Sequence, residues 1–170
     1  MLNKTRLSCA LIAAVGIGST AASAEDGAHR ADLLKALPAA TVTLQRGLTA
    51  ASAQGTLLSA KFEVDEGHLQ LSVYTAKGGA YSEVIVDHVS GKIAKSEAID
   101  EAEDLTAAKA QAAAVAKGSK PLATAVDKAE QESTGYRAVS VVARMHQKHA
   151  VARVELVKGK QFKVVSESLE

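Results

Sequence analysis

SAKFEVDEGHLQLSVYTAKGGAYSEVIVDHVSGKI, residues 59–93, alternates between apolar and polar residues over most of its length and is interrupted by glycine-containing turns. The alternation is clearest in AKFEV, residues 60–64, where apolar residues are separated by charged ones. Because successive side chains of a β-strand point to opposite faces, this pattern is typical of strands that bury one face. Residues 65–67 and 77–79 fit hairpin turns, in which glycine supplies a positive φ angle. The stretch therefore predicts an antiparallel meander with one apolar face, which a helix must cover.

Helices are expected on either side of this meander, and a short helical stretch is expected before them over Arg30–Leu37. Residues 41–53 have apolar side chains at helical spacing, and Gly55 is expected to end that helix. The acidic segment 97–104 and the alanine-rich sequence up to Gly118 predict a long helix, because acidic side chains are favourable at a helix N-terminus. Its buried face is expected to comprise Leu105, Ala108, Ala112 and Val115.

A second helix is predicted over Leu122–Glu132, with Ser119 as its cap and Pro121 in its first turn. Alternating apolar residues then return in residues 139–143 and 152–156, and a closing strand is expected around Phe162. These patterns predict a second meander after the second helix.

The two halves of the chain resemble each other in sequence. Residues 83–86 before the turn at 91–92 resemble residues 153–156 before the turn at 159–160, and 96–99 resemble 166–169. We therefore expect an α+β fold of two repeats, each a helix packed on an antiparallel β-meander, preceded by a cleaved signal peptide. The expected boundaries are 1–24 for the signal peptide, 25–100 for the first unit, 101–117 for a connecting helix and 118–170 for the second unit.

The N-terminal residues have the pattern of a secretory signal peptide. Lys4 and Arg6 precede an apolar segment at residues 7–17, and Ala22-Ser23-Ala24 is typical of a cleavage site. Cys9 lies inside the apolar segment, so a lipid attachment site is not expected there. Cleavage near Ala24 would give a periplasmic or secreted protein that has neither cysteine nor disulfide.

Charge and composition restrict the classes of partner. The chain has 20 Lys+Arg and 19 Asp+Glu, and removal of residues 1–24 would leave 18 against 19. This balance argues against nucleic acid as a partner. The apolar segment at residues 7–17 is shorter than the roughly 20 residues that a membrane-spanning helix needs. We expect neither a membrane span nor a cofactor.

Residues 40–100 resemble the PepSY domain, in which a helix precedes an antiparallel meander that ends in alternating apolar residues, Asp, and x-x-Gly-Lys/Arg-apolar. The residues that match this ending are Val84, Val86, Asp87, Gly91, Lys92 and Ile93, with one extra residue in the turn. The second half is similar over residues 121–165, but Val157 replaces the aspartate. The resemblance implies a small extracytoplasmic protein without catalytic residues. It also implies a role beside secreted peptidases, which PepSY domains are thought to inhibit or assist.

The family-motif residues Asp87, Gly91 and Lys92 have a structural interpretation. An aspartate at a strand end accepts hydrogen bonds from the amides of the following turn, and glycine supplies a positive φ angle. We expect this segment to be a turn and not a ligand site.

His146 and His149 form the one close histidine pair. Two histidines three residues apart could bind zinc or copper if they share a face. Their neighbours are cationic and no cysteine is near, so an ordinary polar loop is expected.

Residues 136–165 are locally basic, with Glu155 as the one acidic residue. Their side chains could form a basic binding face for an acidic partner, or a solvated sheet face. The residues concerned are Arg137, Arg144, Lys148, Arg153, Lys158, Lys160 and Lys163.

These observations favour binding over catalysis. The sequence contains no G-x-S-x-G and no H-E-x-x-H, so we do not expect an enzyme. The expected role is a PepSY-type binding module that modulates or inhibits a secreted peptidase or another envelope protein. A partner peptide could add to an open strand edge by β-augmentation. The alternative is an envelope sensor of a small ligand or metal, with His146 and His149 as the residues to test.

Overall fold

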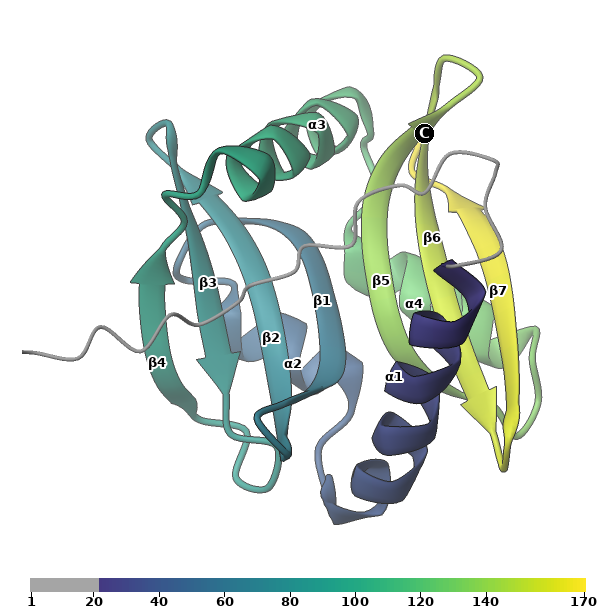
Figure 1. Ribbon diagram of the computed structural model, residues 1–170. Helices are drawn as coiled ribbons and strands as arrows, with labels where there is room; N and C mark the ends of the chain where they lie inside the picture. The colour runs from purple at the N-terminus through teal and green to yellow at the C-terminus, as the bar shows by residue number, and fades with distance from the viewer. Residues whose placement is uncertain (1–21) are drawn as a thin grey trace, which may run out of the picture.

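The computed structural model describes residues 22–170, which form one antiparallel seven-stranded sheet and four α-helices (Figure 1). The helices are α1 (Ala22–Ala36), α2 (Leu44–Ala51), α3 (Ala102–Lys117) and α4 (Leu122–Gln131), with a 3-10 turn, η1, at Leu37–Ala39. The strands are β1 (Thr56–Asp65), β2 (His68–Lys77), β3 (Ala80–Val86), β4 (Ile93–Ala98), β5 (Arg137–His146), β6 (His149–Lys158) and β7 (Gln161–Ser168). The predicted α+β class is therefore confirmed.

The two meanders share a single sheet, whose strand order is β4-β3-β2-β1-β5-β6-β7. They meet where β1 pairs with β5 over only three residue pairs, Ser59 with Val142, Ala60 with Val141 and Lys61 with Ser140. The two strands diverge beyond these pairs. Helix α3 lies across the upper end of this seam and contacts both strands, and α1 lies across the lower end (Figure 1).

The two faces of the sheet differ in cover and in chemistry. Helices α2 and α4 lie behind the sheet in Figure 1, and α1 lies in front of it. On the back face, Leu48 of α2 and Val126 of α4 are fully buried against strand residues such as Val73 and Val154. The front face, which carries α1, is mostly polar, because the strands alternate as the sequence predicts.

A β-bulge in each half sets which side chains reach the front face. In β1 the register shifts between Leu57 and Ser59, and in β5 it shifts between Ala138 and Ser140. A one-residue shift moves every following side chain to the other face. Leu58 at the first bulge consequently leaves the main core and packs in a small cluster with Tyr74 and α3.

The first two helices differ from their predicted bounds. Helix α1 covers residues 22–36, where the sequence suggested a short helical stretch near residues 30–37. Helix α2 begins only at Leu44, because the Thr43 hydroxyl accepts a hydrogen bond from the Arg46 amide and caps it. It ends before Gly55, whose close approach to the carbonyl oxygen of Ala76 leaves no room for a side chain.

The third and fourth helices also require corrections. Helix α3 starts at Ala102, because residues 93–98 form strand β4. Its buried positions are Asp104, Ala108, Gln111 and Ala114, which share Ala108 with the predicted face. Ala112 and Val115 of that face are partly buried and pack against the core. Ser119 does not cap α4: Pro121 stands at the cap position, and the Ser119 amide donates to the Leu169 carbonyl oxygen at 2.6 Å.

Strands of the two halves correspond at a spacing of 81 residues. Strands β1 and β5 each have ten residues and begin at Thr56 and Arg137, and β2 and β6 each have ten and begin at His68 and His149. The sequence alignment of residues 83–86 with 153–156 matched the third strand of one meander with the second strand of the other. The predicted signal peptide lies almost wholly outside the described residues. In residues 22–170 no helix is long and apolar enough to span a membrane.

Candidate interaction face

Polar side chains of β1, β2 and β3 form a connected group on the front face, which we call the first polar cluster. The Lys61 ammonium lies 2.5 Å from a Glu63 carboxylate oxygen, and the Ser72 hydroxyl donates to Glu63 at 2.7 Å. The Tyr74 hydroxyl donates to Glu83 at 3.1 Å, and Lys61 lies 5.7 Å from the centre of the Tyr74 ring. The cluster therefore joins three neighbouring strands through side chains alone.

This cluster is buried, although it is charged. Lys61 is 7% exposed and Glu83 is 3% exposed. Desolvating an ion costs several kcal/mol, so paired charges in an interior add less stability than apolar residues of the same size. Charges kept in such places are candidates for a functional role. These residues carry no motif in the sequence, although their alternation with core residues places them together on the polar face.

In the second half, Arg144 of β5 and Arg153 of β6 lie on the same front face. The strand register places Arg153 opposite Val142 and Arg144 opposite Val151, so the two arginines are diagonal neighbours. Both are half-buried. Within residues 22–170, neither arginine side chain has an ion pair or a hydrogen bond. We call these two residues the arginine pair.

On the front face, the acidic residue next to Arg153 along β6 is already neutralised. Glu155 follows Arg153 on the same face of β6, and its carboxylate lies 2.6 Å from the guanidinium of Arg30 on α1. Arg30 also lies 4.8 Å from the centre of the Phe162 ring on β7. Helix α1 is thereby fixed over the lower part of β6 and β7, and Glu155 is engaged by Arg30.

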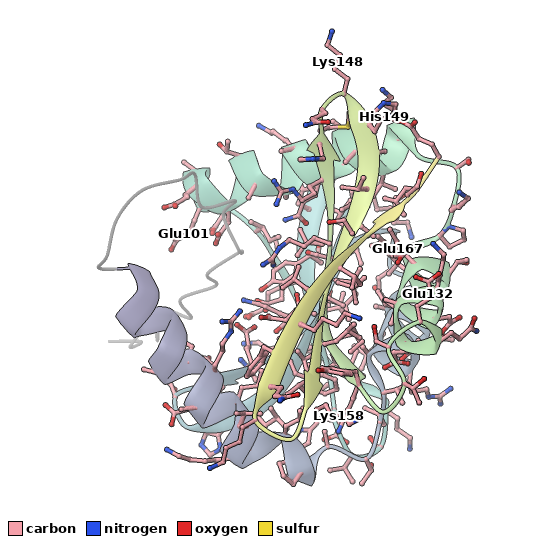
Figure 2. The ribbon with its side chains drawn as sticks, turned by 90° about the vertical axis from the view of Figure 1, so that its right-hand side faces the viewer. Glu101, Glu132, Lys148, His149, Lys158 and Glu167 are labelled. Atoms are coloured by element: carbon pink, nitrogen blue, oxygen red, sulfur yellow. The ribbon has the colours of Figure 1, made fainter. Side chains whose placement is uncertain are left out.

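The structure separates the other predicted basic residues from the arginine pair. Figure 2 shows Lys148 at one end of the sheet and Lys158 at the other. Lys163 donates to the Ser133 hydroxyl at 2.8 Å, and Lys160 lies in the exposed turn between β6 and β7. The seven cations therefore do not form one continuous face.

Arg137 is turned inward and holds the α1–α2 connection. Its guanidinium donates to the Val42 carbonyl oxygen at 2.8 Å and lies 5.0 Å from the centre of the Phe62 ring. Burial lowers the pKa of Arg137, and the nearby Glu130 carboxylate partly opposes this shift.

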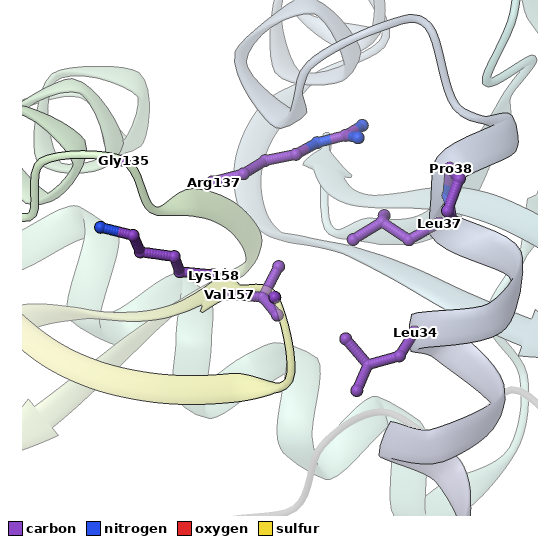
Figure 3. Close-up of a pocket in the computed structure, with 8 residues that line it drawn as sticks. Leu34, Leu37, Pro38, Gly135, Arg137, Val157 and Lys158 are labelled. Carbon is purple, nitrogen blue, oxygen red and sulfur yellow. The ribbon is translucent and has the colours of Figure 1, made fainter.

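Arg137 also borders an open pocket of about 260 Å³ between α1 and β6 (Figure 3). The pocket is lined by Leu34, Leu37, Pro38, Gly135, Arg137, Val157, Lys158 and Gly159, so its ionisable side chains are those of Arg137 and Lys158.

The family-motif residues form a turn that anchors the helices. The Asp87 carboxylate accepts hydrogen bonds from the amides of Ser90 and Val89 at 2.6 and 3.3 Å, and hydrogen bonds from Ser90 hold the Asp87 pKa below its ordinary value. Gly91 has a φ angle of 71°, and Lys92 is exposed. The His88 carbonyl oxygen accepts from the Thr41 amide at 3.0 Å. This turn therefore fixes the segment before α2 to the sheet.

The two histidines flank the β5–β6 turn and are both exposed. His149 contacts the Glu170 carboxylate at 2.9 Å, and this hydrogen bond contributes most to lowering the pKa of Glu170 to about 2. Within the described part of the chain, no three His, Cys, Asp or Glu residues are grouped as a metal site requires. His149 therefore serves the C-terminal contact in this structure.

Comparisons of the chain with protein-family models, with curated proteins and with solved structures find no match.

Proposed function

We propose that this protein is a non-catalytic, PepSY-type binding module of the cell envelope. Its front face binds a protein partner and thereby modulates a secreted peptidase or another envelope protein. The observation that carries the proposal is the difference between the two faces of the sheet. The back face is sealed by α2 and α4, whereas the front face carries the first polar cluster and the arginine pair.

A polar sheet face with fixed charges is suited to recognition. The buried first polar cluster ties β1, β2 and β3 together through the Ser72–Glu63 and Tyr74–Glu83 hydrogen bonds, so the sheet is rigid beside the half-buried arginine pair and little conformational entropy is lost when a partner binds there. Electrostatic complementarity across such a surface gives specificity and a high association rate. The signal peptide predicted for residues 1–24 supports an extracytoplasmic location.

The spacing of 81 residues supports descent of the two halves from one unit. The β1–β2 and β5–β6 turns match in conformation as well as in position, because Glu66 and Gln147 both have a φ angle of 47°. Gly78 and Gly159, again 81 residues apart, both have a φ angle of 59°. We infer that the protein consists of two helix-plus-meander units, the arrangement that the resemblance to PepSY domains implies.

The test of this function is the effect of residues 25–170 on proteolysis by the host's own envelope extract. The rate of casein breakdown is measured against a buffer control, and a dose-dependent fall is expected. A rate that stays at the control value at every dose would contradict the proposed action on a peptidase.

Two matched variants test whether the front face is responsible. Ser166 of β7 lies opposite Arg153 on the front face, whereas Ser96 of β4 lies opposite the core residue Val84 and so points to the back. Both serines are exposed on edge strands. Ser166→Trp is expected to abolish the inhibition, and Ser96→Trp is expected to retain it. Equal behaviour of the two variants would argue against the front face.

A further inference from the structure

We propose that the arginine pair binds carboxylates of an acidic, extended segment of the protein partner. The proposal deepens the binding function proposed above and rests on it. It names the second half of the front face as the charged site and an acidic peptide as its ligand.

The first half of the protein shows that side chains at these two positions can meet. Arg144 and Arg153 lie 81 residues after Glu63 and Ser72, at the same places in the second hairpin. Glu63 and Ser72 form a direct hydrogen bond of 2.7 Å. Arg144 and Arg153, at the corresponding places, can therefore both contact the same carboxylate of a ligand.

The arginine pair lacks a counterion within residues 22–170. Two like charges on a half-buried surface repel each other, and water screens this repulsion less there than on an open surface. An anion between them would remove the repulsion and accept several charge-assisted hydrogen bonds. The planar guanidinium group matches a carboxylate in a two-pronged geometry. The site is thus organised for an anion that residues 22–170 do not supply.

The neighbours of the arginine pair favour a peptide as the source of the anion. Val151 lies opposite Arg144 and is half-buried, and Val164 of β7 is 41% exposed on the same face. Ser166 and Ser168 provide hydroxyl groups along the outer strand. An extended chain that alternates acidic and apolar residues would place carboxylates on the arginines and apolar side chains on the valines. A flat anionic membrane would bind best to several cations grouped at one protruding end of the protein. Lys148 and Lys158 lie at opposite ends (Figure 2), so this arrangement favours a peptide over a membrane as the source of the anion.

The experiment uses residues 25–170 and a fluorescent peptide, Gly-Glu-Val-Glu-Val-Glu-Gly, with binding followed by fluorescence anisotropy at low salt. A second peptide carries glutamine in place of each glutamate. The parent protein is expected to bind the glutamate peptide about tenfold or more tightly than the glutamine peptide, since each charge-assisted hydrogen bond contributes to affinity. Added sodium chloride should weaken the binding.

The decisive variant is Arg144→Gln/Arg153→Gln, and its matched control is Lys77→Gln/Lys160→Gln, which removes two exposed turn cations. The arginine variant should bind the glutamate peptide about tenfold or more weakly, and the lysine variant should bind it like the parent. The urea midpoint of the arginine variant should equal or exceed that of the parent, because a repulsion is removed. Equal affinity of parent and arginine variant, or equal affinity for both peptides, would overturn the proposal.

Vesicles containing phosphatidylglycerol and, separately, inorganic phosphate are tested with the same three proteins, and the two peptides serve as competitors. Tighter, arginine-dependent binding to vesicles or phosphate than to the glutamate peptide would overturn the peptide assignment. If the peptide does not bind while Ser166→Trp and Ser96→Trp still differ in the proteolysis assay, only the role of the arginine pair fails. If the peptide binds and the extract assay shows no effect, the proposed action on a peptidase fails and the proposal for the arginine pair stands.

Discussion

Removal of the Glu130 side chain should destabilise the fold more than removal of any neighbouring acid on α4. One Glu130 carboxylate oxygen accepts a hydrogen bond from the Ala138 amide at 2.7 Å, at the β5 bulge. The other accepts from the Gln45 side chain of α2 at 2.7 Å. This single carboxylate therefore joins α2, α4 and the bulge, and the bulge places Ser140 and Arg144 on the front face.

The expected cost of Glu130→Ala can be worked from these two contacts. Ala138 is fully buried, so its amide would be left without a partner, which costs about 1–3 kcal/mol. Loss of the hydrogen bond from Gln45 costs about 1 kcal/mol more. The free energy of unfolding should therefore fall by about 2–4 kcal/mol. Glu130→Gln should cost less, because a glutamine oxygen can still accept from the Ala138 amide.

The assay is urea unfolding at neutral pH followed by circular dichroism. Asp127→Ala is the matched control, because Asp127 is exposed on the same helix and contacts Gln45 at 3.2 Å. The control should change the free energy of unfolding by no more than about 0.5 kcal/mol. A Glu130→Ala protein as stable as the Asp127→Ala control would refute the reasoning, since the Ala138 amide would then have found another partner.

Three further changes test other parts of the structure. Gly91→Ala should lower the free energy of unfolding by about 1–2 kcal/mol, because a φ angle of 71° strains a residue with a Cβ atom; a urea midpoint equal to that of the parent would contradict this. Leu48→Ala should cost about 2–5 kcal/mol, because Leu48 is fully buried in the main core, and thermal unfolding measures it. The pKa of Glu170 is lowered from 4.5 to about 2, first by the hydrogen bond from His149, so its stabilising contribution is present above pH 4.5 and is lost as the pH falls toward 2. Glu170→Gln should lack this part of the acid dependence, and urea midpoints compared at the two ends of that window would show it.

The alternation of apolar and polar residues was enough to predict the meanders and the apolar face, but it does not reveal the bulges. Leu58 continues the apolar alternation of Ala60 and Phe62, yet it packs with Tyr74 because the register shifts beside it. A bulge depends on pairing with a neighbouring strand, which a single strand's sequence does not record.

The buried face of α3 illustrates a different limit. Alanines occupy so many positions of this helix that apolar spacing does not select one face. The helix rests on the seam between β1 and β5, and this places Asp104 and Gln111 in the interior. Tertiary contacts, not the local pattern, decide its orientation.

Part of the candidate site can be predicted from the sequence. A two-residue turn at Gln147 and Lys148 pairs His146 with His149, and counting outward places Arg144 and Arg153 on one face. In the sequence these arginines lie with five other cations in one basic segment, so the predicted basic face included all seven. Because successive residues of a strand point to opposite faces, counting positions along the hairpin separates Arg144 and Arg153 from cations that are near them only in sequence.

The two halves carry different side chains at equivalent positions, and this difference is the reason for proposing the charged site in the second half. In the first half, Glu63 and Ser72 satisfy each other with a hydrogen bond, and Lys61 neutralises the carboxylate. In the second half the corresponding residues are Arg144 and Arg153, and Val142 stands at the position of Lys61. The first arrangement holds three strands together without a ligand. The second leaves two cations that have no ion pair within residues 22–170, and this is why we propose a binding site in that half, where the same backbone carries a structural cluster in the other.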